Sequence, residues 1–354
     1  MSEKMKVAVI GCGRIANSAH IPSYRKLDDV EIKYFCDLIP EKAQKSADEY
    51  GSGIVITDYK QALADPEVKA ISVCTPNKDH KFISIDALHA GKHVLCEKPA
   101  ARDYSEALEM QKAQHETGLT LNIGVVNRFS NAVRLVKQMI DAGELGEVYH
   151  VYAAFRRYRG IPGLGGAFTT KAISGGGALI DCGVHFIDIV MFCTDDPTPI
   201  TASGKAFSKL GVDMKNYVYN SMWAEDTKDL NGTYDVDDFV TAFIRTSGPT
   251  LSLNGSWDQN IGQPESYIDF LGTKAGIRLN YGGSFTIWGV KDGKLTSEVP
   301  AYEPNDAFAT EIAEFCKCVR TGEKLPSHID RNILTSKIMQ GIYDSSMADR
   351  EIVF

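Results

Sequence analysis

Residues 6–16 read Lys-Val-Ala-Val-Ile-Gly-Cys-Gly-Arg-Ile-Ala. The apolar run before Gly11 predicts a buried strand, and the glycines after it predict a tight turn into a helix. Gly11 permits the turn, Gly13 lets the backbone approach a phosphate, and Ala16 allows close helix–strand packing. The pattern therefore indicates a dinucleotide-binding turn, although an ordinary strand–turn–helix would also explain it. The candidate cofactor contacts in this turn are Gly11, Gly13, Arg14 and Ile15.

The next predicted strand, residues 31–37, ends in an acid, Asp37, which comes 21 positions after Ala16. At that place a carboxylate can accept hydrogen bonds from the adenine ribose hydroxyls. It would also repel a 2′-phosphate, so the sequence favours NAD over NADP. The alternative is that Asp37 caps the helix predicted near residues 41–50, which would leave the choice of cofactor open.

Strands and helices continue to alternate up to about residue 126, which predicts a parallel, doubly wound sheet. Loops at the carboxyl ends of such strands share one rim, where ligands bind. We therefore expect an NAD(P)-binding Rossmann domain over residues 1–126. The further rim residues expected to contact the cofactor are Thr75, Pro76, Asn77, His80, Glu97, Lys98 and Asn127.

The run from His93 to Pro99 reads as a short buried strand that stops at a charged pair and a proline. Pro99 cannot donate to a sheet ladder, so the strand must end there. Lys98 is then placed at the carboxyl end of a parallel strand, where open α/β sheets bind ligands. A solvated loop lysine is the alternative.

The pattern changes after Asn127, and we expect a second, α+β domain over residues 127–354 for substrate binding and oligomerisation. A helix is predicted at 131–142 and a strand at 146–155, followed by a glycine-rich, flexible loop that begins at Arg156. That loop would either cover a binding site or be an ordinary surface loop. Alternating segments between residues 200 and 289 predict a large, mostly antiparallel sheet, and two helices close the chain. An uncovered face of this sheet would suit a partner subunit.

Residues 174–191 begin Ser-Gly-Gly-Gly and then read as a helix with one apolar stripe. Asp181, His185 and Asp188 form an adjacent polar stripe at positions i, i+4 and i+7. A carboxylate four residues before a histidine can orient its ring, which suits acid–base chemistry. A structural histidine is the alternative.

Composition excludes several classes of function. The formal charge of −8 and a pI near 5.6 argue against nucleic-acid binding. No apolar run approaches the roughly 18 residues of a membrane span, and Met1–Met5 leads directly into a strand without a signal-peptide segment. The eight cysteines contain no Cys-x-x-Cys pair, so we expect free thiols, no metal site and a cytoplasmic protein.

Taken together, these pieces resemble the glucose–fructose oxidoreductase / inositol dehydrogenase / rhizopine catabolism (Gfo/Idh/MocA) family over essentially the whole chain. The resemblance is carried by residues 11–16, by Cys74-Thr75-Pro76-Asn77 with His80, by Glu97-Lys98-Pro99, and by the triple glycine leading to Asp181 and His185. It implies NAD(P)-dependent oxidation of sugars, inositols or related polyols, with Lys98, Asp181 and His185 as the catalytic set. It also implies a cis Lys98–Pro99 bond, an open-faced sheet, and dimers or tetramers.

The reaction expected from this resemblance removes a proton and a hydride from a secondary alcohol. His185 would be the general base, Lys98 would stabilise the developing alkoxide, and Asp181 would orient the substrate or the imidazole. Two alternatives remain: an enzyme that keeps and recycles its NAD, such as a glycoside 3-dehydrogenase, and a non-catalytic NAD(P)-binding regulator. The expected substrate contacts are Lys98, Arg128, Arg156, Tyr158, Asp181 and His185, with Arg157, Asp188 and Trp257 as further candidates.

Overall fold

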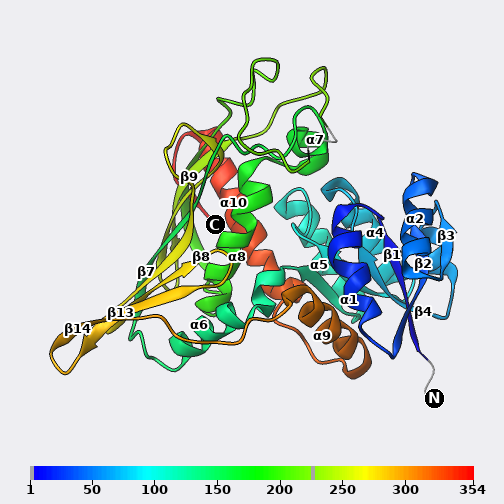
Figure 1. Ribbon diagram of the computed structural model, residues 1–354, viewed down its shortest axis with the longest axis horizontal. Coiled ribbons are helices and arrows are strands. Elements are labelled where there is room, and N and C mark those ends of the chain that lie inside the picture. Colours follow the sequence, from blue (N-terminus) through cyan, green and yellow to red (C-terminus); the bar gives the residue numbers. More distant parts are fainter. Residues whose placement is uncertain (1–3, 225–227) are drawn as a thin grey trace. The chain divides into compact units, whose positions relative to one another are not determined.

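The computed structural model describes residues 4–224 and 228–354, and these form two compact units. Residues 1–3, at the end where no signal peptide is expected, lie outside this description. The first unit comprises Met1–Ala101, Ser105–Phe129 and Asn305–Ile333, and the second comprises Arg102–Tyr104, Ser130–Pro304 and Leu334–Phe354. Figure 1 shows the elements of each unit in sequence colours.

These units differ from the expected domains, 1–126 and 127–354, in one large segment. Helix α9 (Ala307–Thr321) belongs to the first unit, because Ile312, Phe315 and Cys316 pack into the same core as Tyr24 and Phe35. An amphipathic helix pattern shows that one face is buried, but not which core buries it. The sequence therefore could not place this helix.

The first unit is built on a six-stranded, wholly parallel sheet with the order β3-β2-β1-β4-β5-β6. Its strands are β1 (Met5–Ile10), β2 (Val30–Cys36), β3 (Ile54–Ile56), β4 (Val68–Val73), β5 (His93–Glu97) and β6 (Leu121–Gly124). The order reverses between β1 and β4, and open α/β sheets bind ligands at the carboxyl ends of the strands beside such a switch point. This confirms the predicted doubly wound sheet.

Helices connect these strands and cover the sheet, as its apolar strands require. They are η1 (Ala16–His20) with α1 (Ile21–Arg25), α2 (Pro40–Tyr50), α3 (Lys60–Ala64), α4 (Asn77–His89) and α5 (Tyr104–Thr117), followed by the short η2 (Val126–Phe129). Helix α2 lies within one residue of the helix predicted near residues 41–50. The segment η1 is a π-helical turn, which the sequence pattern did not indicate.

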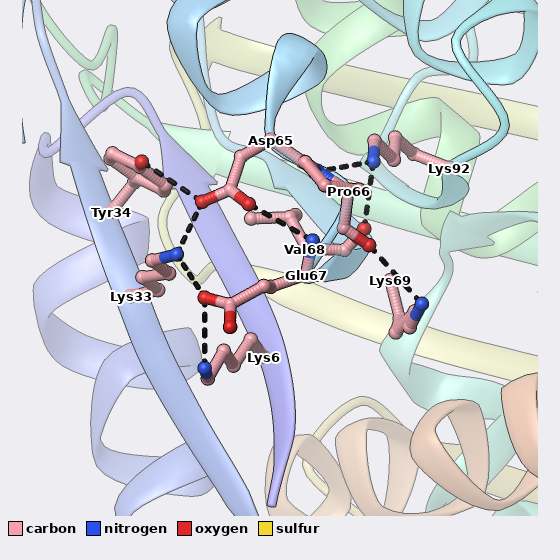
Figure 2. A network of polar contacts seen from close by, with 9 residues as sticks. All are labelled: Lys6, Lys33, Tyr34, Asp65, Pro66, Glu67, Val68, Lys69 and Lys92. Carbon is pink, nitrogen blue, oxygen red and sulfur yellow. Dashed lines mark hydrogen bonds and ion pairs between the residues drawn. The ribbon is translucent and has the colours of Figure 1, made fainter.

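A polar network ties together the amino ends of the strands, away from the carboxyl rim (Figure 2). The Asp65 carboxylate accepts hydrogen bonds from Lys33 Nζ, from the Tyr34 hydroxyl at 3.0 Å and from the Glu67 amide at 2.9 Å. Lys92 Nζ donates to the Asp65 carbonyl at 2.7 Å. These contacts fix the turn before β4, so they stabilise the fold.

The second unit carries a nine-stranded sheet with the order β14-β13-β12-β11-β7-β10-β9-β8-β15. The strands are β7 (Val148–Tyr158), β8 (Pro199–Phe207), β9 (Phe239–Thr246), β10 (Thr250–Gln259), β11 (Glu265–Gly272), β12 (Ala275–Asn280), β13 (Phe285–Lys291), β14 (Lys294–Glu298) and β15 (Ile352–Val353). All neighbouring pairs are antiparallel except β7 with β10. The predicted large, mostly antiparallel sheet is confirmed.

The prediction that a loop begins at Arg156 is wrong, although residues 159–166 do lack regular secondary structure. Arg156 and Tyr158 belong to β7, because β10 and β11 pair with this strand up to those positions. The chain beyond them is held rather than loose: Ile161 and Leu164 are fully buried in the core of the second unit. The prediction failed because the pairing partners lie about a hundred residues away in the sequence.

The second unit buries one sheet face against helices α8 (Val184–Cys193) and α10 (Ile329–Ala348), which Figure 1 shows side by side. Two shorter helices complete it, α6 (Asn131–Asp141) and α7 (Lys171–Ser174), together with the turn η3 (Ala167–Thr169). The expectation that no apolar run approaches the length of a membrane span is wrong for one run of the described residues, Lys171–Cys193, which is long and apolar enough to cross a membrane. However, 89% of its most apolar window is buried inside the protein. It is therefore a core segment.

Candidate active site

The glycine-rich turn after β1 has the two properties that its glycines predict. Gly11 has a φ of +90°, and a Cβ there would lie 2.6 Å from the Cys74 carbonyl oxygen, so only glycine fits. At Gly13, by contrast, a Cβ would meet no atom of the described residues within 4 Å. The space beside Gly13 is thus open, and a side chain at this position would occupy it. The turn has the shape that admits the pyrophosphate of a dinucleotide, and backbone contact from Gly13 remains a prediction.

Asp37 lies against this turn and is fixed through both carboxylate oxygens. Its Oδ2 accepts a hydrogen bond from the Cys12 amide at 2.9 Å, and its Oδ1 accepts one from the Ile39 amide at 2.9 Å. The N-cap of helix α2 is Ile39, not Asp37, which answers the capping alternative. Asp37 therefore lies at the end of β2 beside the phosphate turn, in the position of a ribose-binding acid.

Cys12 lies in the middle of the turn, but its thiol is unreactive. Burial raises the pKa of its thiol to about 11, against an opposing hydrogen bond from Ser46, and the Asp37 charge raises it further. A thiol with that pKa stays protonated at neutral pH and is a poor nucleophile. It therefore adds no negative charge where anionic phosphates would lie.

Both ring nitrogens of His80 face backbone carbonyl oxygens rather than a ligand site. Its Nδ1 lies 2.8 Å from the Pro99 carbonyl oxygen and its Nε2 lies 2.9 Å from the Thr75 carbonyl oxygen, and the ring is fully buried. Burial lowers its pKa even though both carbonyls oppose that effect. His80 thus joins the loops that follow β4 and β5. Its predicted contact with the cofactor is replaced by a role in shaping the rim.

The other rim residues from the first unit lie where the strand pattern places them. Thr75 follows β4, and its amide nitrogen is 2.9 Å from where a Cβ of Gly11 would lie. Pro76 is the N-cap of helix α4 and Asn77 its first residue. Asn127 lies in η2. Their contact with a cofactor remains a prediction.

Glu97 closes β5, and the Lys98–Pro99 peptide bond after it is cis, as the resemblance implies. Lys98 is half-buried, and its amide donates to Oε2 of Glu97 at 3.1 Å. Arg128 is fully buried and donates from Nη1 to the Pro326 carbonyl at 2.8 Å. Such burial suits a residue that stabilises the first unit, and it argues against the predicted substrate contact.

The second unit carries the predicted acid and histidine on one continuous helical segment. Asp181 lies in a π-helical turn, η4 (Leu179–Gly183), which runs directly into α8 with His185 in its first turn. Such π turns are frequent at functional sites. The Nε1 of Trp257 donates to Oδ2 of Asp181 at 3.0 Å, and Trp257 is fully buried on β10. Asp181 is thereby held in one orientation against the sheet.

His185 lies beside an aromatic pair. The ring centroid of Tyr281 lies 6.1 Å from that of His185 and 5.0 Å from that of Phe186, on which Tyr281 stacks. Tyr281 is 43% exposed. Asp188, the third member of the predicted stripe, is buried, and the hydroxyl of Thr335 donates to its Oδ1 at 3.3 Å. Asp188 therefore faces α10 in the core, and the structure removes it from the candidate substrate contacts.

Each of the three glycines before this helix lies too close to a neighbouring residue to carry a side chain. A Cβ at Gly175 would lie 2.3 Å from the Arg102 carbonyl oxygen. At Gly176 it would meet the Tyr343 hydroxyl at 2.1 Å, and at Gly177 the Asp237 carbonyl oxygen at 1.9 Å. The Asp237 carboxylate, buried beside them, accepts hydrogen bonds from the amides of Gly177 at 2.8 Å and Leu179 at 2.9 Å. Asp237 therefore anchors the start of the helix that carries Asp181.

The remaining candidates lie at the end of β7. Arg156 pairs with Glu265 at 2.8 Å and with Gln259 Oε1 at 3.3 Å, and Tyr158 is 42% exposed. Sequence reasoning missed Asp237 and Tyr281 and ranked Trp257 low. An Asp just before a strand and a Tyr just after one carry no local signal of function, because their partners are distant in sequence. Among the described residues no group of three or more His, Cys, Asp or Glu side chains is arranged to hold a metal.

Comparison with known proteins agrees with this geometry. Residues 5–125 match the model of an oxidoreductase family with an NAD-binding Rossmann fold, and residues 133–278 match the GFO/IDH/MocA C-terminal domain. A D-glucoside 3-dehydrogenase of Escherichia coli (strain K12) is 33% identical over 280 residues, which cover 78% of this chain and 78% of that protein. A scyllo-inositol 2-dehydrogenase (NAD(+)) of Bacillus subtilis (strain 168) is 25% identical over 328 residues, covering 91% of this chain and 88% of the relative.

A solved structure of levoglucosan dehydrogenase in complex with NADH superposes with a TM-score of 0.86 and covers 99% of both chains. At 21% identity this likeness shows the fold alone. The two matched domain models and the 33% identical relative go further, because together they span both units. The chain therefore belongs to the GFO/IDH/MocA family of oxidoreductases, and its first unit is built on that family's NAD-binding Rossmann fold.

Proposed function

We propose that this oxidoreductase transfers a hydride reversibly between a secondary alcohol of a sugar, inositol or glycoside and NAD. The observation that carries the proposal is the Asp181 carboxylate, fixed by the Trp257 indole four residues before His185. A positioned carboxylate and histidine suit removal of an alcohol proton, because acid–base catalysis needs the proton-accepting group held in place. Bound NAD would supply the hydride acceptor.

In this proposal three side chains divide the work. His185 removes the hydroxyl proton in oxidation and returns it in reduction. Lys98 donates a hydrogen bond to the same oxygen and stabilises the negative charge that develops there. Asp181 orients the substrate or the imidazole. Arg156 and Tyr158 are proposed as further substrate contacts. The proposed cofactor site combines the glycine-rich turn with residues at the ends of the strands: Gly11, Gly13, Arg14, Ile15, Asp37, Thr75, Pro76, Asn77, Glu97 and Asn127.

A narrower form of the proposal concerns glycosides. The relative at 33% identity is a D-glucoside 3-dehydrogenase, which favours oxidation of a ring hydroxyl of a glycoside. Such an enzyme could keep its NAD through the reaction cycle, as in the recycled-cofactor alternative. Nucleotide released by denaturing the purified protein, identified by chromatography, would support this form, and protein free of nucleotide would contradict it.

We also propose a cytoplasmic homodimer or homotetramer that binds neither nucleic acid nor membranes. All eight cysteines are buried free thiols, as a reducing compartment allows. A groove of about 660 Å³ on the nine-stranded sheet is lined by residues that include Tyr152, Phe243 and Tyr267. Aromatic side chains of this kind are enriched in subunit interfaces. Light scattering after gel filtration would test the assembly, and a monomer at micromolar concentration would refute it.

The decisive assay follows nicotinamide reduction by absorbance. Purified protein is incubated with NAD or NADP and a panel of inositols, aldoses, sugar acids and glycosides. Reduction of NAD with one class of polyol is the expected result. A preference for NADP would overturn the assignment of Asp37 but leave the chemistry intact. Protein that binds NAD, carries no trapped nucleotide and reduces it with none of these substrates would contradict the proposed substrate class.

A further inference from the structure

A chain of buried polar side chains leads from helix α1 to the end of β5. The Tyr24 hydroxyl lies 2.7 Å from Oγ of Ser72, and that Oγ lies 3.2 Å from Nδ1 of His20. The Nε2 of His20 lies 2.9 Å from Oε1 of Glu97. Tyr24, Ser72 and His20 are fully buried and Glu97 nearly so. All four belong to the first unit.

With His20 neutral, one arrangement of protons gives each of these three hydrogen bonds a donor and an acceptor. The Glu97 carboxylate can only accept, so Nε2 of His20 carries the hydrogen and donates it. Its Nδ1 then accepts from the hydroxyl of Ser72, whose oxygen accepts from the hydroxyl of Tyr24. All three hydrogen bonds point in the same direction, toward the carboxylate. Such aligned chains strengthen their members.

The second oxygen of Glu97 faces Lys98. Oε2 accepts the Lys98 amide hydrogen at 3.1 Å. Burial favours the neutral acid, but the hydrogen bond from His20, the charge of Lys98 and the Lys98 amide outweigh it, so the pKa of Glu97 lies below its usual value. Glu97 is therefore a buried carboxylate ion whose two oxygens are fixed by His20 and by Lys98.

Two buried thiols and His80 also lie near Glu97. Burial raises the pKa of the Cys74 and Cys96 thiols, and the negative charge of Glu97 raises both further. Burial lowers the pKa of His80. Lys98 is the cation beside Glu97, and its charge favours the ionised form of that carboxylate.

We propose that His20 is a positioning residue for Lys98, acting through Glu97, with Ser72 and Tyr24 holding its imidazole. His20 ends the π turn that follows the glycine-rich loop. The segment beside the nucleotide site is thus joined to the lysine that donates to the substrate oxygen. This inference rests on the proposed function, which gives Lys98 that role.

The test is a double-mutant cycle on His20→Leu and Glu97→Gln, with kcat, KM and the Kd of NADH measured for each variant. Each single change is expected to lower kcat roughly 10- to 100-fold with KM within about threefold, and His20→Leu should also leave the Kd of NADH within about threefold. The double variant should lose no more than the worse single variant, because His20 acts through Glu97. Losses that multiply in the double variant would overturn the inference.

Matched serines and a conservative replacement separate positioning from folding. Ser72 and Ser84 are both fully buried in the first unit. Ser72→Ala should lower kcat severalfold, whereas Ser84→Ala should leave it unchanged. His20→Gln keeps an N–H donor near Glu97 and should recover much of the loss seen in His20→Leu. Equal effects of the two serine changes, or no recovery by Gln, would contradict a positioning role.

A readout that needs no substrate distinguishes this inference from the proposed function. Trace acetic anhydride acylates neutral amines, and peptide mass spectrometry measures the rate at Lys98. Glu97→Gln removes the negative charge beside Lys98, and His20→Leu removes the hydrogen bond that favours the ionised form of Glu97. Both changes should therefore raise that rate at least threefold, and Ser84→Ala should not. If the rates shift but no polyol is oxidised, the proposed function fails and the His20–Glu97 link stands. Unchanged rates refute the link whatever the activity.

Discussion

The indole nitrogen of Trp257 lies 3.0 Å from Oδ2 of Asp181, and it joins the centre of the nine-stranded sheet to the helix that carries His185. Trp257 is itself anchored by its backbone. Its amide donates to the Asp238 carbonyl at 2.9 Å, and its carbonyl accepts from Gly160 at 3.0 Å. The carboxylate of Asp181 is therefore positioned by a rigid element, as precise catalytic geometry requires.

Trp257→Phe removes the donor to Asp181 and keeps an aromatic ring. We expect kcat to fall roughly 10- to 100-fold, because a displaced catalytic carboxylate loses alignment, while NADH affinity stays unchanged. Steady-state kinetics at a temperature where both proteins are folded measure the effect. Trp288→Phe is the control, since Trp288 is 45% exposed on β13. The assigned role of Trp257 is refuted by equal kcat values in the two variants.

The two glycines of the turn after β1 should respond differently to alanine. Gly13→Ala should change the free energy of unfolding by no more than about 0.5 kcal/mol, because its Cβ meets no described atom within 4 Å. It should weaken NADH binding at least tenfold, about 1.4 kcal/mol. Gly11→Ala should cost about 1–3 kcal/mol of stability, since its φ is +90°. Urea unfolding and NADH fluorescence titration measure both. An unaltered NADH affinity in Gly13→Ala would contradict the placement of the NADH phosphates in this turn.

Asp237 should be essential to the start of the Asp181 helix. Asp237→Asn places an amide donor where Oδ1 or Oδ2 now accepts backbone hydrogens, so we expect a loss of about 1–3 kcal/mol in unfolding free energy. Tyr343→Phe deletes one donor to the same carboxylate, at 2.7 Å, and should cost about 1 kcal/mol. Asp213→Asn, in an exposed turn, should be neutral in urea unfolding. A neutral Asp237→Asn variant would show that this anchor is dispensable.

The network in Figure 2 predicts how stability depends on acid. The hydrogen bonds from Lys33 and from the Glu67 amide lower the pKa of Asp65 from its ordinary value of 3.8 to about 2, against a small opposing effect of burial. Because the folded pKa is depressed, this contribution is present above pH 4 and lost as pH falls toward 2. Asp65→Asn should therefore cost about 0.2–1 kcal/mol at pH 7.

Urea unfolding between pH 7 and pH 3 checks this dependence. The difference between wild type and Asp65→Asn should be constant down to about pH 5 and narrow below pH 4. Asp48→Asn, which changes an exposed contact within α2, should give a small difference that does not vary with pH. A gap for Asp65→Asn that widens in acid would have the wrong sign and would reject the assignment.

Local sequence signals predicted the features that depend on local chemistry. The Gly-x-Gly turn, the acid that ends β2 and the strand that stops before Pro99 need only the residues themselves. Contacts between distant residues could not be predicted in this way. His20 and Glu97 are 77 positions apart, and Trp257 and Asp181 are 76 apart.

Four further failures have physical causes. The length of β7 is set by strands that come much later in the chain, and the core that receives α9 is not encoded in its apolar stripe. Strand β14 was missed because its side chains are mostly exposed, so it shows no alternation. The burial of Arg128 was missed because arginine is rarely buried without a partner, and its carbonyl partner at Pro326 is far away in sequence.

The most direct measurement of the central claim compares wild type with His185→Ala in NAD reduction, using the best polyol from the panel. The account predicts that kcat falls by about 10²- to 10⁴-fold, the usual worth of a positioned acid–base group, while the Kd of NADH changes less than threefold. Tyr281→Phe keeps the ring beside His185 and serves as the matched control, with little loss of kcat. A His185→Ala variant that turns over at the wild-type rate would contradict the account.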